Sequence, residues 1–274
     1  MKKILLFILM TLSTVSFAQK VVQKIEIKNG FYEIPAIYTY DDAIKNQPIV
    51  VMLHGSASNK DEVMGTYIKL ADSLYDKGIS SIRFDFIGTG DSKVDYLHYT
   101  PTTALSDTNR VIDFAKSKTN SKIGLLGWSE GGTIAILAGD NKILSSLATW
   151  AAATDLLDEV KDLYPEAKKN GFAIHKFDWR DSLKQSLQWF EEVQKLDVLD
   201  KVKNIDIPIM ALSGTNDTDV DPNIAKAIIK NSKNLKSKFV SINGADHVFN
   251  LFSDKPKVDE GINITTNWFV ETLK

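Results

Sequence analysis

A serine with a glycine on either side stands near the middle of the chain, in the segment Gly127-Trp128-Ser129-Glu130-Gly131. An apolar run, 122–126, precedes this segment and another apolar stretch, 132–138, follows it. We therefore expect a strand, a sharp turn and a helix, with the serine hydroxyl lifted above the sheet edge. Glycines let such a turn close without a Cβ clash, and the first N–H groups of the helix point toward whatever reacts there. The pattern predicts a nucleophilic serine.

A nucleophilic serine needs a base, and the base needs an acid that orients it. His247 follows an expected strand at 238–242, and Asp217 follows an expected strand at 207–212. Both side chains therefore fall on loops after strands, on the same edge as Ser129. The chain order is serine, aspartate, histidine.

Two further aspartates, Asp219 and Asp221, stand close enough in sequence to orient His247 instead. Plainer interpretations also exist for the other two side chains. Ser129 could be an ordinary turn serine, and His247 could be a loop histidine with a purely structural hydrogen bond.

Strands alternate with helices through most of the chain, which predicts a mostly parallel sheet with helices on both faces. Ligands of such sheets bind at the carboxyl ends of the strands. The turn signal Asn29-Gly30 predicts an N-terminal hairpin that forms an antiparallel edge. Expected strands cover 21–28, 31–40, 48–53, 79–84, 122–126, 145–150, 207–212 and 238–242, and expected helices cover 61–77, 105–115, 132–138, 222–229 and 258–273.

One segment, 155–204, is much longer than a normal crossover between strands. It contains two expected helical pieces, 156–164 and 181–196, and several aromatic residues. We expect a small helical cap over the carboxyl end of the sheet, inserted into a core formed by 19–154 and 205–274. A peripheral decoration remote from the site is the alternative.

The first residues resemble a secretory signal peptide, 1–18, with Lys2 and Lys3 before an apolar stretch and small residues before Gln19. The chain is then expected in the periplasm or outside the cell, with no stable membrane insertion once this segment is removed. A membrane anchor is the alternative, although the apolar run is short for a bilayer.

Composition excludes several other classes of protein. The chain has no cysteine and a net charge of −2, so disulfides and thiolate metal sites are ruled out, and no basic patch suggests nucleic acid as a partner. Lys93 stands where a dinucleotide loop begun by 88–90 would need its third glycine. Neither a phosphate-binding G-x-x-x-x-G-K-[ST] motif nor H-E-x-x-H occurs. We therefore expect no cofactor and no metal.

The order of these groups and their loops resembles the α/β-hydrolase family over residues 21–274. The similarity is greatest to small esterases of the feruloyl and cinnamoyl type and to serine-aminopeptidase-like hydrolases. The matching motifs are His54-Gly55, the loop 83–92 and the acid loop 214–220.

The resemblance implies Ser129 as nucleophile, His247 as base and Asp217 as acid. It also implies that the backbone N–H of Ser56 stabilises the oxyanion. The backbone N–H of Glu130, at the helix start, is the second expected donor.

Other polar residues near these motifs have plainer expected roles. The carboxylate of Glu130 is expected to be solvated or salt-bridged. Asp85 is expected to brace loops, and His54 to fix the oxyanion loop by hydrogen bonding. His98 and His175 are expected on surface or cap segments, where His175 is the one that could touch substrate.

These expectations combine into a secreted serine hydrolase that cleaves small-molecule carboxylic esters with small or aromatic acyl groups, through an acyl-serine intermediate. A peptidase or amidase of the same fold is the alternative, with Glu159, Asp162 or Asp178 gripping a peptide terminus. A non-enzymatic binding protein would predict a broken triad, whereas this sequence keeps all three residue types.

Overall fold

The computed structural model describes residues 19–274, and the expected signal peptide lies outside them. The described chain forms an eight-stranded sheet in the order β1-β2-β4-β3-β5-β6-β9-β10. From β4 to β10 neighbouring strands are parallel, and β2 is antiparallel to both β1 and β4. The strands are β1 (Lys20–Asn29), β2 (Tyr32–Asp41), β3 (Ile49–Leu53), β4 (Ser80–Phe84), β5 (Ile123–Trp128), β6 (Leu144–Trp150), β9 (Ile209–Gly214) and β10 (Lys238–Ile242).

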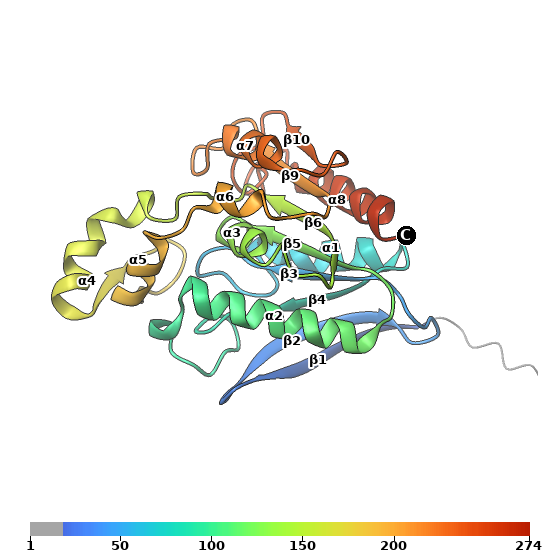
Figure 1. The fold of residues 1–274 in the computed structure, drawn as a ribbon, viewed down its shortest axis with the longest axis horizontal. Helices are drawn as coiled ribbons and strands as arrows, with labels where there is room; N and C mark the ends of the chain where they lie inside the picture. The colour runs from blue at the N-terminus through green and yellow to red at the C-terminus, as the bar shows by residue number, and fades with distance from the viewer. Residues whose placement is uncertain (1–18) are drawn as a thin grey trace, which may run out of the picture.

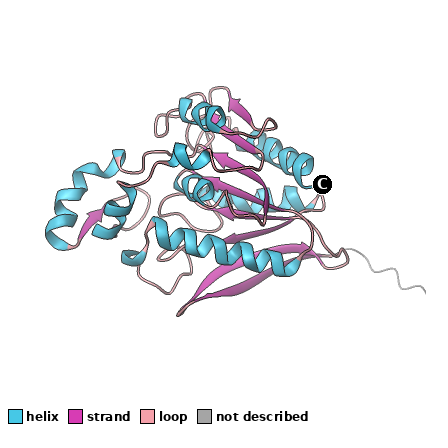
Figure 2. Ribbon diagram, in the orientation of Figure 1, coloured by secondary structure: helices cyan, strands magenta, loops and turns pink. Residues whose placement is uncertain are grey.

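Helices cover both faces of this sheet (Figures 1 and 2). One face packs against α2 (Pro101–Lys118), α3 (Glu130–Leu137), α6 (Val198–Val202) and α7 (Asn223–Asn231). The other face packs against α1 (Thr66–Tyr75) and α8 (Val258–Leu273). A mostly parallel sheet between two helical layers is the predicted architecture.

Strand β3 explains why the sheet needs both layers. All five of its residues are buried. Side chains alternate across a strand, so Ile49, Val51 and Leu53 enter the core on the α2 side. Val50 and Met52 enter the core on the α1 side. A continuous apolar run is therefore what a strand in this position requires.

The N-terminal hairpin forms the antiparallel edge as predicted, but its turn is displaced by one residue. Asn29 still pairs with Tyr32, so Gly30 and Phe31 form the two-residue loop. Gly30 has φ +61°. Glycine at the first position of a two-residue hairpin loop is the requirement of a type II′ turn, which explains the shift from the expected Asn-Gly pair.

The cap segment, residues 155–204, extends beyond the end of the sheet, at the left of Figure 1. It contains the 3₁₀ helix η3 (Asp158–Leu163), helices α4 (Tyr164–Asn170) and α5 (Leu187–Val193), and a second sheet formed by β7 (Phe172–His175) and β8 (Leu183–Ser186). Its last element, α6, contacts α3 and α7 of the core.

The expectation of one helix over 181–196 is wrong. Its first part forms β8, which pairs antiparallel with β7. The helix begins only after Ser186, whose hydroxyl accepts a hydrogen bond from the N–H of Trp189 at 3.1 Å and caps α5. Two short 3₁₀ helices complete the description, η1 (Val63–Gly65) and η2 (Tyr96–His98). Within 19–274, no helix is both long and apolar enough to cross a membrane.

A buried carboxylate ties α2 to the hairpin. Asp107 is fully buried and accepts hydrogen bonds from the Asn29 amide at 2.8 Å and from the Tyr32 hydroxyl. Burial raises the pKa of Asp107 to about 6, although these hydrogen bonds oppose the shift. The folded protein therefore binds this proton more tightly than the unfolded chain does.

This raised pKa predicts a contribution to stability that grows as the pH falls. As the pH falls from about 7 to 4.5, Asp107 becomes protonated in the folded protein but stays mostly ionised in the unfolded chain. This difference should add about 2 kcal/mol to the free energy of unfolding. Asp107→Asn removes this titration. Urea unfolding of the natural protein and of Asp107→Asn across that pH range gives the difference between their free energies of unfolding. The other titrating groups cancel in this difference, so its change with pH measures the contribution of Asp107. A difference that does not vary with pH would contradict the assignment.

Candidate active site

Ser129 occupies a strained turn between β5 and α3. Its backbone has φ +54° and ψ −122°, an unusual conformation for a residue with a Cβ. The flanking glycines allow very close packing. A Cβ on Gly127 would overlap the carbonyl of Gly131, and a Cβ on Gly131 would overlap the carbonyl of His54. The strand-turn-helix geometry predicted for this motif is present.

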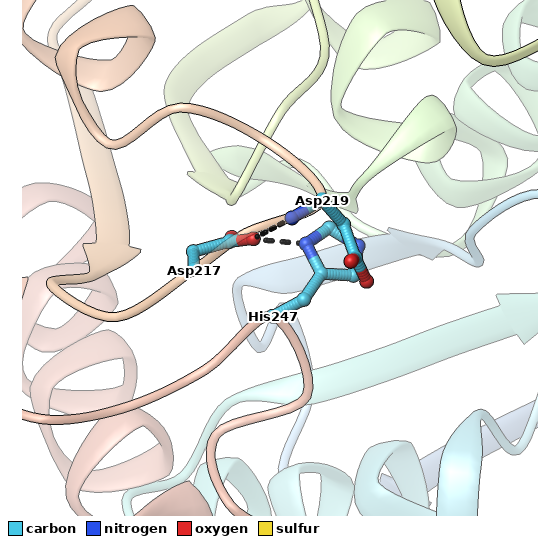
Figure 3. Close-up of side chains that lie close together, drawn as sticks. All are labelled: Asp217, Asp219 and His247. Atoms are coloured by element: carbon cyan, nitrogen blue, oxygen red, sulfur yellow. Dashed lines mark hydrogen bonds and ion pairs between the residues drawn. The ribbon is translucent and has the colours of Figure 1, made fainter.

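Asp217 and His247 meet on the loops that follow β9 and β10 (Figure 3). The Nδ1 of His247 lies 2.9 Å from Oδ2 of Asp217. A carboxylate can only accept, so Nδ1–H is the donor. The Asp217 side chain is fully buried, and 16% of the His247 side chain is exposed.

The loop itself orients the Asp217 carboxylate. Its Oδ1 accepts from the N–H of Asp219 at 3.0 Å and from the N–H of Val220 at 2.9 Å. Of the three aspartates considered from the sequence, His247 hydrogen bonds Asp217, and Asp219 supports that carboxylate through its main chain. With its acid fixed in this way, the imidazole has a defined tautomer with its second nitrogen as the basic one.

Ser129, Ser56 and Glu130 line a common cavity of about 200 Å³. Its wall also includes residues 219–221 from the acid loop, whereas Asp217 and His247 are not among the described residues that line it. The structure thus brings the expected nucleophile and both expected oxyanion donors to one cavity. It brings the expected acid and base to the adjoining loops.

The cap contributes a second wall to this cavity. His175 from β7, Gln185 from β8 and Trp189 from α5 all line it. His175 is the cap histidine that was expected to be able to reach substrate, whereas His98 is exposed. Gln185 was not expected at the site, and Trp189 was only one of several aromatic residues of 155–204, because only the packing of the cap decides which of its side chains face the cavity.

Of the two environments expected for the Glu130 carboxylate, solvated or salt-bridged, the structure contradicts the solvated one, since only 3% of the residue is exposed. Its Oε1 accepts from the indole N–H of Trp189 at 3.3 Å. Burial of the Tyr99 side chain raises the pKa of its hydroxyl, and the nearby charge of Glu130 and a hydrogen bond to that carboxylate raise it further. The carboxylate thereby connects the core to the cap, through partners that lie far away in the sequence.

His54 serves the neighbouring loop as expected. Burial lowers its pKa to about 4, so the ring is neutral at physiological pH. Its Nδ1 lies 2.8 Å from the carbonyl of Gly55, and its Nε2 accepts from the N–H of Phe86 at 3.2 Å. The ring therefore joins the loop after β3 to the loop after β4.

Asp85 braces the same loops, as expected. Its carboxylate is fully buried and accepts from the backbone N–H of Lys60 and from the Lys60 ammonium group, both at 2.7 Å. It also accepts from the N–H of Asp91 at 2.9 Å. These contacts connect the loop after β3 with the loop after β4, and Asp85 is not among the described residues that line the cavity.

Comparison with known proteins supports this description. A family model for serine aminopeptidases of family S33 matches residues 44–169. An acyl transferase from Shewanella hanedai is 25% identical over 220 residues, which cover 75% of this chain and 68% of that protein.

Solved structures resemble almost the whole chain. Est1E from Butyrivibrio proteoclasticus, with bound ferulic acid, has a TM-score of 0.74 at 20% identity and covers 90% of this chain and 98% of its own. A monoacylglycerol lipase from Paleococcus ferrophilus has a TM-score of 0.67 at 18% identity and covers 87% of this chain and 99% of its own. Together with the sheet order and the serine turn, these matches identify the chain as a member of the α/β-hydrolase fold.

Proposed function

We propose that the protein is a secreted serine hydrolase that cleaves carboxylic esters with a small or aromatic acyl group. The observation that carries the proposal is the 2.9 Å hydrogen bond between His247 and a buried Asp217, at the sheet edge where Ser129 forms its strained turn. Such a pair is what converts a serine hydroxyl into a nucleophile. The esterase, lipase and acyl transferase among the similar proteins are consistent with acyl chemistry.

The proposed reaction proceeds through a covalent intermediate. Ser129 Oγ attacks the substrate carbonyl while Nε2 of His247 takes its proton, and Asp217 stabilises the resulting imidazolium. The N–H groups of Ser56 and Glu130 receive the negative charge on the former carbonyl oxygen. Collapse of this tetrahedral species expels the alcohol, which takes the proton back from His247. Water, activated by the same histidine, then releases the acid from Ser129.

The cavity suggests the acyl group. Its volume of about 200 Å³ fits a small acid, and Trp189 contributes an aromatic wall. The aromatic residues of the cap segment are the reason for expecting an aromatic acyl group, and among its described phenylalanines, tyrosines and tryptophans only Trp189 lines the cavity. Phe177 makes an edge-to-face contact with Trp179, and 63% of Trp179 is exposed. The preference for an aromatic acyl group therefore depends mainly on Trp189.

A second candidate, an amidase or aminopeptidase acting on short peptides, is favoured by the charge of the same cavity. Five carboxylates line it, and among its described lining residues there is no lysine or arginine. Such a wall would favour a substrate with a protonated amine. Asp162, one of the cap acids considered from the sequence, lines a neighbouring cavity instead. The carboxylates in question are Glu130, Asp155, Asp158, Asp219 and Asp221.

Replacing the nucleophile tests the proposed chemistry. Ser129→Ala should lower kcat/KM for p-nitrophenyl acetate by about 10³-fold or more, because the acyl-serine can no longer form. The same variant should not react with a fluorophosphonate probe. Ser117→Ala, which removes an exposed hydroxyl on α2, is the matched control and should behave like the natural protein. Turnover that survives in Ser129→Ala would contradict the proposal.

A substrate panel separates the two candidate functions. We expect p-nitrophenyl propionate and hydroxycinnamoyl esters to be cleaved faster than alanine p-nitroanilide, because esters have the better leaving group and the cavity has an aromatic wall. Initial rates measured with each compound at matched concentrations provide the comparison. A higher kcat/KM for the anilide, decreasing as salt screens the acidic wall, would favour the aminopeptidase.

Secretion is tested separately. When the full-length chain is expressed in a Gram-negative host, the exported protein should begin at Gln19, because Ser16-Phe17-Ala18 provides small residues at the cleavage site. N-terminal sequencing of the periplasmic fraction measures this. A protein that keeps Met1 and sediments with membranes would instead indicate an anchor.

A further inference from the structure

A buried carboxylate that the proposed reaction does not use stands behind the loop of Ser56. Glu62 precedes η1, and only 6% of its surface is exposed. Burial raises its pKa, while hydrogen bonds from the loop and the charge of nearby His247 oppose the shift. A carboxylate in this position needs several donors to compensate for its lost hydration.

Those donors come from both ends of the loop 54–58. Oε1 of Glu62 accepts from the backbone N–H of Gly55, and Oε2 accepts from the hydroxyl of Ser58 at 2.9 Å. Oε2 also accepts from the N–H of Val63 at 3.0 Å. One carboxylate therefore holds the beginning and the end of the turn that contains Ser56.

The peptide between Gly55 and Ser56 is held from its other side as well. The Gly55 carbonyl accepts from the N–H of Ser58 at 3.2 Å and lies 2.8 Å from Nδ1 of His54. A trans peptide is planar, with its C=O and N–H pointing in opposite directions. Fixing the Gly55 carbonyl therefore fixes the direction of the Ser56 N–H, the expected oxyanion donor.

The segment 54–62, which contains this loop and Glu62, needs support from its surroundings because its backbone is strained at two positions. Ala57 has φ +53° and Glu62 has φ +59°, in a region that residues with a Cβ rarely occupy. Such conformations persist only where the surroundings hold them. The support also lies next to the nucleophile, since a Cβ on Gly55 would be 3.4 Å from both Glu62 Oε1 and Ser129 Cβ.

We propose, on the basis of the serine hydrolase function proposed above, that Glu62 is a positioning residue for acyl transfer. Its carboxylate clamps Gly55 and Ser58 so that the N–H of Ser56 is aimed at the developing oxyanion. Glu62 acts through the loop and does not touch the substrate. Because an oxyanion donor acts mainly in the transition state, loosening the clamp should lower kcat and leave KM nearly unchanged.

The test compares Glu62→Ala, Glu62→Gln and Asp61→Ala with the natural protein, using p-nitrophenyl acetate. Glu62→Ala should lower kcat by about 10²-fold, the typical effect of a catalytic group displaced by about 1 Å. Glu62→Gln keeps an oxygen for the Gly55 N–H and should lose only about fivefold, because a neutral acceptor bonds less strongly than a carboxylate. Asp61→Ala removes the adjacent carboxylate, whose partner is Arg83, and should keep its kcat.

Several outcomes would overturn the proposal. One is an unchanged kcat in Glu62→Ala that circular dichroism shows to be folded. Another is a loss of kcat in Glu62→Ala that is equally large in Glu62→Gln. The third is an effect on KM alone. If Glu62→Ala does not fold, Ser58→Ala carries the test, because it removes half of the clamp. A lower kcat at constant KM then supports the proposal, and an unchanged kcat contradicts it.

Failure of this inference is distinguishable from failure of the proposed function. If Ser129 is not required for turnover and does not react with a fluorophosphonate, the hydrolase mechanism itself is wrong. If turnover requires Ser129 and the natural protein reacts with the fluorophosphonate, but the Glu62 variants have the same kcat as the natural protein, only the positioning role is wrong.

Discussion

The close approach of β5, α3 and the end of β3 is the constraint on which the site depends. There is no room for a Cβ atom between Gly127 and the carbonyl of Gly131, or between Gly131 and the carbonyl of His54. This contact starts α3 directly beneath the strand and forces Ser129 into its positive φ. It also brings the loop after β3 against the nucleophile. A single methyl group at either glycine would move the serine away from the loop expected to stabilise its reaction.

Parallel strands complete the arrangement by bringing distant segments together. The ends of β9 and β10 lie at the same edge as the end of β5, so residues thirty positions apart form the Asp217–His247 pair. The two N–H groups that orient Asp217 come from the next residues of its own loop. Long-range topology therefore supplies the meeting of acid and base, whereas local loop geometry supplies their orientation.

Local patterns predicted the strands of the main sheet and the turn that contains Ser129, because the information for them is local. The apolar run of β3 and the glycine-flanked serine are each contained in a few consecutive residues. The expectations that were wrong concern contacts between separate segments of the chain. Trp189, which donates a hydrogen bond to the buried Glu130 carboxylate, lies in the cap, and β8 forms its ladder with β7. No spacing within 181–196 carries that information.

Buried carboxylates have a common use around this cavity. Glu62 accepts from backbone N–H groups of the loop after β3, Asp85 accepts from the loops after β3 and β4, and Glu130 joins the core to the cap. A buried charge is a costly source of stability, because desolvation offsets much of its attraction to its partners. A buried charge does fix the orientation of its partners, however, because moving one partner away leaves the charge uncompensated. The positions of these acids, all behind or beside strained loops, favour orientation as the property they supply.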